Sequence, residues 1–336
     1  MKYVSGEILT VDGLTRGYLS FNDREIVEFG KGCCPKKPVS KGLIVPSFVN
    51  AHTHIGDSFI RKKEIDLPRD VEALVAPPVG LKHKLLKKAT ENELIEGMEE
   101  SINVMIKSGT KIFSDFREDG IIGVCLLKTA LAHWKISSII LSRPDNMIYH
   151  KNEIDILLNL SDGIGLSSIS DWNINELKKI VHHTKQKKKI FSIHASESIR
   201  EDIDKILDLK PDFLIHMIKA SKSDLIRVKE NDIPIVICPR SNAFYGLKPN
   251  YKLLKKIGNK ILIGTDNGML NPPNLLDEIN YTISCFKGFS KIDLLNMITY
   301  DARKVLNQEC DILGSNSKAE FVVLNKQTLK PLYISV

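Results

Sequence analysis

Residues 43–54 read LIVPSFVNAHTH, an apolar run that ends in two histidines one residue apart. A run rich in β-branched residues is typical of a buried strand. Side chains alternate between the two faces of a strand, so His52 and His54 point the same way. Two imidazoles side by side at a strand end make half of a divalent-metal site. The alternative is that both are ordinary polar residues of a loop.

Further apolar runs follow this one along the chain. Between them lie segments with helical periodicity, such as residues 91–107, 174–187 and 223–231. Strands that alternate with helices eight times predict a (β/α)8 TIM barrel, an α/β fold. The expected strands occupy residues 43–50, 111–116, 136–142, 163–168, 189–194, 213–216, 233–238 and 261–265.

The two ends of the chain have a different pattern, with short strands separated by turns. Residues 1–42 show it, and residues 320–324 and 332–336 return to it. Neither end alone has enough residues to bury a sheet. We therefore expect a small composite β-domain of residues 1–42 plus 312–336, beside a barrel domain of residues 43–311.

Composition excludes several classes of protein. The 336 residues are 43% apolar and 26% charged, as in ordinary globular proteins. The net charge of +7 is modest and the lysines are scattered, which disfavours a nucleic-acid groove. No apolar run approaches the roughly 20 residues that span a bilayer, and the N-terminus lacks the apolar core of a signal peptide. Six cysteines without a C-x-x-C pair are typical of reduced thiols, so we expect a cytoplasmic protein that binds neither nucleic acid nor membrane.

Metal-type and acid–base residues recur where the expected strands end, which is where barrels of this kind carry catalytic groups. His194 ends the fifth strand and is followed by Glu197, His216 ends the sixth, and Asp266 follows the eighth. Any one of them alone could be a capping or core residue. Together with the histidine pair they favour a site in which a divalent ion lowers the pKa of a water toward about 7. Glu197 is placed to give a proton to a substrate, and His216 could orient the water.

These motifs resemble those of the amidohydrolase superfamily, in particular its branch of cytosine deaminases, chlorohydrolases and adenosine or guanine deaminases. The resemblance extends from Gly42 to about Leu324. It rests on His216 and on these stretches: PSFVNAHTH (46–54), HASE (194–197), CPRSN (238–242), GTDN (264–267), TYDARKVL (299–306) and AEFVVL (319–324).

The resemblance implies a role for each site residue. The metal ligands would be His52, His54, His194 and Asp266. Glu197 would protonate the ring nitrogen and the leaving group, His216 would help to polarise the attacking water, and Asp266 would also act as the base. The resemblance further implies a β-sandwich formed from both chain ends and an assembly of at least two copies.

Departures from the superfamily bear on the metal and the substrate. Two-metal members use a carboxylated lysine at the end of the fourth strand, where this chain has GLSSIS (165–170). We therefore expect a single ion. We expect that ion to be zinc, with Fe²⁺ or Mn²⁺ as alternatives, because such sites accept several metals. The His-Ala-Pro-Tyr stretch of many nucleoside deaminases is also missing there, which leaves the substrate open.

Polar residues at other strand ends are candidates for substrate binding. Arg117, Arg143 and Arg240 could pair with a carboxylate or phosphate of the substrate, or could form structural ion pairs across the rim. Asn242 closes the CPRSN motif beside Arg240.

A long connection, residues 57–88, separates the first two expected strands. Connections of this length are usually functional, so we expect a lid that brings Lys82 or His83 over the substrate; the alternative is a surface excursion.

We therefore expect a mononuclear metal-dependent hydrolase of non-peptide C–N bonds, an aminohydrolase of a purine, pyrimidine or related heterocycle. Opening of a cyclic amide, or displacement of another leaving group, would use the same core and stays an alternative. A non-catalytic barrel scaffold is a further alternative, which the complete set of ligand residues disfavours.

Overall fold

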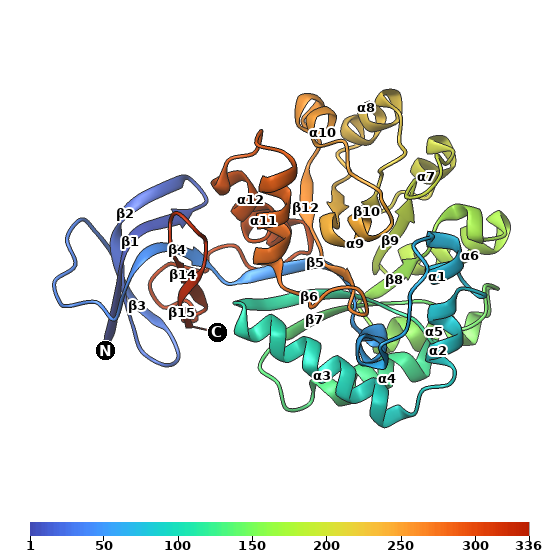
Figure 1. The fold of residues 1–336 in the computed structure, drawn as a ribbon, viewed down its shortest axis with the longest axis horizontal. Helices are drawn as coiled ribbons and strands as arrows, with labels where there is room; N and C mark the ends of the chain where they lie inside the picture. The colour runs from blue at the N-terminus through green and yellow to red at the C-terminus, as the bar shows by residue number, and fades with distance from the viewer. Residues whose placement is uncertain (336) are drawn as a thin grey trace.

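Residues 1–335 of the computed structural model form two β-sheets, with helices arranged around the larger one (Figure 1). The smaller sheet lies at one end of the molecule, together with both chain termini. The larger sheet is curled and makes up the other end with its helices.

The larger sheet is parallel, with the strand order β12-β11-β10-β9-β8-β7-β6-β5-β13. The short strands β12 and β13 belong to one run of chain. β12 pairs with β11, while β13 pairs with β5 at the opposite edge, so the sheet curls until its two edges share this run. Its strands are β5 (Phe48–His54), β6 (Thr110–Arg117), β7 (Ser137–Ser142), β8 (Gly163–Leu166), β9 (Ile190–Ala195), β10 (Phe213–His216), β11 (Ile235–Ile237), β12 (Ile261–Ile263) and β13 (Asp266–Asn267).

Helices follow most of these strands and cover the outside of the curled sheet (Figure 1). The longest, α3 (Glu91–Lys107), begins at a capping box of Thr90 and Glu93 and buries Leu94, Met98 and Met105 on one face. The others are α4 (Gly120–Leu131), α5 (Lys151–Leu160), α6 (Ile174–Gln186), α7 (Ile203–Asp208), α8 (Lys222–Glu230), α9 (Pro239–Phe244), α10 (Tyr251–Ile257), α11 (Leu275–Cys285), α12 (Lys291–Met297) and α13 (Tyr300–Val305).

The smaller sheet has the strand order β15-β14-β4-β1-β2-β3 and takes strands from both chain ends. An apolar cluster that includes Ile8, Phe21 and Phe321 packs on it. The second layer that would make this unit a β-sandwich stays a prediction. The strands are β1 (Lys2–Thr10), β2 (Gly13–Phe21), β3 (Ile26–Lys31), β4 (Ser40–Pro46), β14 (Phe321–Leu324) and β15 (Pro331–Ser335).

The apolar run at residues 43–50 is divided between the two sheets. β4 ends at Pro46 and pairs with β1 and β14, whereas β5 begins at Phe48 and pairs with β6. The expected domain boundary at residues 42 and 43 therefore cuts through β4, and we propose Ser47 as the crossing point. Hydropathy gave no sign of the break because both halves are buried.

The connection between β5 and β6 has secondary structure of its own. It contains the 3-10 helix η1 (Ile55–Lys63) and the helices α1 (Val71–Val75) and α2 (Leu81–Leu86). Leu74, Lys82 and Leu86 are buried, so the segment packs onto the barrel and is no simple excursion into solvent. Its movement as a lid stays a prediction.

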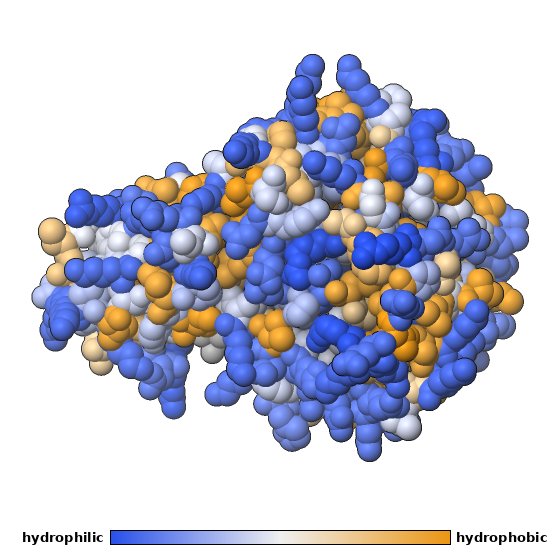
Figure 2. Space-filling view, in the orientation of Figure 1, coloured by the Kyte–Doolittle hydropathy of each residue, from blue (hydrophilic) through white to orange (hydrophobic). Residues whose placement is uncertain are grey.

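The face shown in Figure 2 is mostly hydrophilic, with hydrophobic residues scattered over it in small groups. Within residues 1–335, the structure has no helix with the length and apolarity that crossing a membrane requires. Association of two or more copies stays a prediction.

Candidate active site

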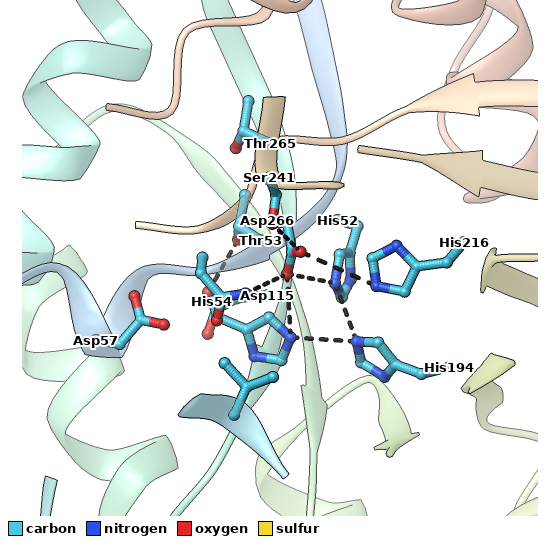
Figure 3. A network of polar contacts seen from close by, with 12 residues as sticks. His52, Thr53, His54, Asp57, Asp115, His194, His216, Ser241, Thr265 and Asp266 are labelled. Carbon is cyan, nitrogen blue, oxygen red and sulfur yellow. Dashed lines mark hydrogen bonds and ion pairs between the residues drawn. The ribbon is translucent and has the colours of Figure 1, made fainter. Parts of the chain in front are cut away.

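Four side chains expected to bind a metal converge at the carboxyl ends of the strands (Figure 3). His52 and His54 come from β5, His194 from β9 and Asp266 from β13. The Nε2 atom of His194 lies 3.2 Å from that of His52 and 3.3 Å from that of His54. Asp266 Oδ1 lies 3.3 Å from His52 Nε2 and 3.7 Å from His54 Nε2. Residues more than 200 positions apart in the chain thus present four donor atoms to one point.

These spacings fit ligand atoms around a four-coordinate ion. With bonds of about 2.0–2.1 Å, the corners of a tetrahedron lie about 3.4 Å apart. His194 Nδ1 bonds to Leu166 O at 2.8 Å, and His54 Nδ1 lies 2.8 Å from Glu118 Oε1, so each neutral ring carries its proton on Nδ1. The two Nε2 lone pairs therefore face each other, an arrangement that a cation between them would stabilise. The residues present fit a divalent metal.

Burial favours the neutral form of His54 and His194, which is the form that binds metal. Burial, followed by the charge of Lys82, lowers the pKa of His54 to about 4. Burial, followed by the charge of His52, lowers the pKa of His194 well below its usual value.

His216 offers an alternative to His54 in the ligand set, since a second group of donor atoms also lies within 4.8 Å: His52, His194, His216 and Asp266. His216 Nε2 is the more distant donor, at 3.9 Å from Asp266 Oδ2, and it lies 3.4 Å from Glu197 Oε1. Asn242 Nδ2 lies 3.1 Å from His216 Nδ1 and donates to Glu197 Oε1 at 3.2 Å. A donor at Nδ1 would leave the proton of His216 on Nε2, where the ring cannot ligate, and the expectation that His216 lies beside the ion stays a prediction.

Two buried carboxyl groups of the site have opposed pKa shifts. Burial, and then the negative charge of Asp266, raises the pKa of Glu197 well above its usual range. Burial also disfavours the charged form of Asp266, but the hydrogen bond and charge of His52 outweigh it and hold the pKa of Asp266 well below its usual range. Such a pair supplies a proton donor and a proton acceptor in one cavity.

The backbone is strained where it presents two of these side chains. Asp266 has a φ of 60° and His216 a φ of 76°, both in the left-handed region that few non-glycine residues adopt. Strain of this kind clusters at functional sites. Gly264 passes so close to β5 that a Cβ there would lie 2.7 Å from His52 Cβ, so the GTDN motif needs glycine at this position.

The donor atoms open onto a cavity of about 450 Å³, a size suited to a small molecule. Val71, Val75 and Val79, from α1 and the turn before α2, line one part of it. Ser167, Ser168 and Asp171, which follow β8, line another. The cavity therefore has both apolar and polar walls.

Two of the predicted substrate-binding residues lie at this cavity, and a third, Asn242, contacts Glu197, which lines it. Lys82 and Arg143 line it. The guanidinium of Arg143 has no hydrogen bond or ion pair to any side chain in residues 1–335, so it is free to bind a ligand. Asn242 is buried and contacts Glu197 and His216, which suits it to orienting them.

The other three residues predicted to contact the substrate are not among those that line the cavity, and each contacts a protein group, so their role in substrate binding stays a prediction. Arg117 lies 3.0 Å from Glu118 Oε2, His83 Nε2 lies 3.0 Å from Val75 O, and Arg240 Nη2 donates to Asn271 at 2.8 Å. A cation at a strand end pairs with the nearest acceptor. The sequence pattern does not show whether that acceptor belongs to the protein or to the substrate.

Sequence reasoning missed Glu118, which lines the cavity and contacts both His54 and Lys82. The available signal was its place directly after β6, where Arg117 was chosen instead. It also missed Ser241, whose Oγ donates to Asp266 Oδ2 at 2.6 Å.

Comparison with known proteins identifies the family. Residues 43–334, most of the chain, match the model of the amidohydrolase family. The chain belongs to the amidohydrolase family. This confirms the predicted superfamily and makes the protein a metal-dependent hydrolase that acts on C–N bonds.

Two relatives and one solved structure show which proteins this chain is similar to. This amidohydrolase is 36% identical to an uncharacterized protein of Methanocaldococcus jannaschii, over 96% of this chain and 86% of that protein. It is 26% identical to a 5-methylthioadenosine/S-adenosylhomocysteine deaminase of Caldicellulosiruptor saccharolyticus, over 77% of this chain and 66% of that protein. Its fold resembles that of an adenosine deaminase from Xanthomonas campestris with bound zinc, with a TM-score of 0.75 at 16% identity over 96% and 84% of the two chains.

Proposed function

We propose that this amidohydrolase is an aminohydrolase that releases ammonia from an amino-substituted purine, pyrimidine or related heterocycle. The observation that carries the proposal is the pair of opposed carboxyl groups, Glu197 and Asp266, beside three imidazoles. A deamination needs a proton donor for the nitrogen that leaves and a proton acceptor for the water that adds. The relative described as a methylthioadenosine deaminase supports an aminopurine as one substrate class.

One divalent metal, zinc by preference, would be held by His52, His54, His194 and Asp266. When bound, the ion lowers the pKa of a water toward about 7 and so supplies a nucleophile at neutral pH. The absence of a lysine from residues 163–170 supports a single ion. The zinc in the Xanthomonas structure supports zinc, although Fe²⁺ and Mn²⁺ suit the same donors.

The chain's own residues would move the protons. Asp266 would accept the proton of the water as oxygen adds to the ring carbon that bears the amino group, and His216 would orient that water through its Nε2 proton. Glu197, whose pKa is raised by burial, would donate a proton to the ring nitrogen. The proton on Asp266 would then pass to the amino group and the remaining hydroxyl proton would return to Glu197, so the C–N bond breaks, ammonia leaves and the ring carbon keeps an oxo group.

Arg143 would bind a carboxylate or phosphate on the substrate, because its side chain lines the cavity and pairs with no protein group within residues 1–335. Asn242 would fix the orientation of Glu197 and His216, because its Nδ2 lies 3.2 Å from Glu197 Oε1 and 3.1 Å from His216 Nδ1.

The alternative reactions need the protonated Glu197 to different degrees. Ammonia and a ring amide both require protonation of the departing nitrogen, whereas a halide leaves without it. The raised pKa of Glu197 therefore favours a nitrogen leaving group. Cyclic-amide opening stays the second candidate, and the complete set of ligands argues against a non-catalytic scaffold.

The test is ammonia release by the zinc-loaded protein from a panel of purines, pyrimidines, their nucleosides and pterins, with Glu197→Gln as the matched control. We expect ammonia in equal amount to the oxo product, and a loss of at least about a hundredfold in the variant. Ring opening of a cyclic amide without ammonia would replace the proposal with the second candidate.

A further inference from the structure

Lys82 is a buried cation whose ammonium contacts three protein groups. Its Nζ lies 2.5 Å from Glu118 Oε1 and 3.3 Å from Asp57 Oδ2, and it donates to Asn267 Oδ1 at 3.1 Å. The side chain is only 3% exposed. The contacts with Glu118 and Asp57 are ion pairs, and the contact with Asn267 is a hydrogen bond.

Two of these partners lead directly to metal ligands. Glu118 Oε1 lies 2.8 Å from His54 Nδ1, and Asn267 Nδ2 donates to Asp266 Oδ1 at 3.0 Å. His54 belongs to β5 and Asp266 to β13, the neighbouring strands at which the curled sheet meets itself. The ammonium of Lys82, from α2, therefore contacts both Glu118, which lies beside the β5 ligand, and Asn267, which donates to the β13 ligand.

The carboxylates around Lys82 depend on its charge. Asp57 and Glu118 are both buried, and neither Asp57 Oδ2 nor Glu118 Oε1 has a hydrogen-bond partner of good geometry in residues 1–335. A buried carboxylate that loses its counter-ion is strongly destabilised. Without the ammonium, Glu118 would be drawn toward Arg117, which contacts its other oxygen at 3.0 Å, and away from His54.

We propose that Lys82 is a positioning residue of the metal centre: it holds Glu118 and Asn267, and through them fixes His54 and Asp266 for metal binding. The inference rests on the metal ligands of the proposed function. It differs from the expectation that Lys82 contacts the substrate, since its ammonium is buried among three protein groups. Loss of such an outer partner typically weakens metal affinity by about 10- to 100-fold.

The test is the dissociation constant for zinc, measured without substrate by competition with a chromophoric chelator. Lys82→Met and Glu118→Gln are compared with Lys84→Met, which removes an exposed lysine of the same helix. We expect a loss of about 10- to 100-fold in each of the first two variants and no change in the third. The double variant should lose less than the sum of the two single losses, because both variants remove the contact between Lys82 and Glu118.

Circular dichroism of the metal-free proteins shows which variants fold. If Lys82→Met does not fold, the zinc affinity of Glu118→Gln alone tests the inference. A wild-type zinc affinity in folded Lys82→Met with a raised KM would assign Lys82 to the substrate and overturn the inference, as would fully additive losses. Wild-type protein that binds no zinc would instead contradict the proposed function.

Discussion

The carboxylate of Glu118 lies 2.8 Å from Nδ1 of His54, on the side of the ring that faces away from the other ligands. The negative charge beside Nδ1 favours a proton on that atom and leaves Nε2 free to ligate, in the manner of carboxylate–histidine–metal triads. The ligand geometry is thus set by groups outside the ligand set, which makes the site testable at several residues.

Replacing Glu197 by Gln should separate metal binding from proton transfer. The amide can still accept from Asn242 but cannot donate an acidic proton, so we expect full zinc content and a kcat lower by at least about a hundredfold. Steady-state kinetics and elemental analysis of the same sample measure both quantities. Undiminished turnover would remove Glu197 from the mechanism.

Removal of the metal should abolish activity and lower thermal stability. A ligand that binds only the folded state at a hundred times its dissociation constant adds about 2.7 kcal/mol to the free energy of unfolding. We expect a chelator to lower Tm and added zinc to restore both Tm and activity. A Tm that does not respond to zinc in either direction would count against a metal bound inside the fold.

Much of the site could be predicted from the sequence because its residues stand directly after strands of recognisable hydropathy. His216 is the last residue of β10, and Asp266 follows β12 after two residues. The parallel arrangement then brings strand ends together without further information. The same reasoning located the two chain ends in one sheet, since both showed the pattern of short strands.

What the sequence could not show was which polar group each side chain would meet. Arg117 and Glu118 are adjacent at the end of β6, yet Arg117 turns into a buried ion pair while Glu118 reaches a metal ligand. The division of residues 43–50 between two sheets was hidden for a similar reason, since burial on either sheet gives the same hydropathy. Partners set by tertiary packing leave no local signal.

Arg143→Met should affect only substrates that carry a carboxylate or phosphate. The loss of a charge-assisted bidentate contact is worth about 1.5–3 kcal/mol, which corresponds to a KM raised about tenfold or more. Arg143→Lys keeps the positive charge but lacks the planar guanidinium, so its KM should lie between the values for wild type and Arg143→Met. Equal KM changes for neutral and anionic substrates would mean that Arg143 does not recognise an anion.

Glu278 should make stability fall as pH rises. Burial raises its pKa to about 8, although the Arg240 backbone N–H and charge oppose the shift. A group whose pKa is raised on folding stabilises the protein below its unfolded pKa, near 4.5, and this contribution is lost as pH rises to about 8. At about 1.4 kcal/mol per pKa unit, the loss is on the order of a few kcal/mol.

The comparison of wild type with Glu278→Gln isolates this residue from other groups that titrate in the same range, such as Asp57, whose pKa burial raises to about 7. Urea unfolding of the zinc-loaded proteins between pH 5 and 9 should show a flatter profile for the variant. Parallel profiles would show that Glu278 does not titrate in this window.

The most direct test of the account is a crystal structure of the zinc-loaded protein with anomalous data collected at the zinc edge. We expect one peak per chain, bonded to Nε2 of His52, His54 and His194 and to a carboxylate oxygen of Asp266, with His216 outside bonding distance. A peak ligated by His216 in place of His54, or no peak among these residues, would contradict it.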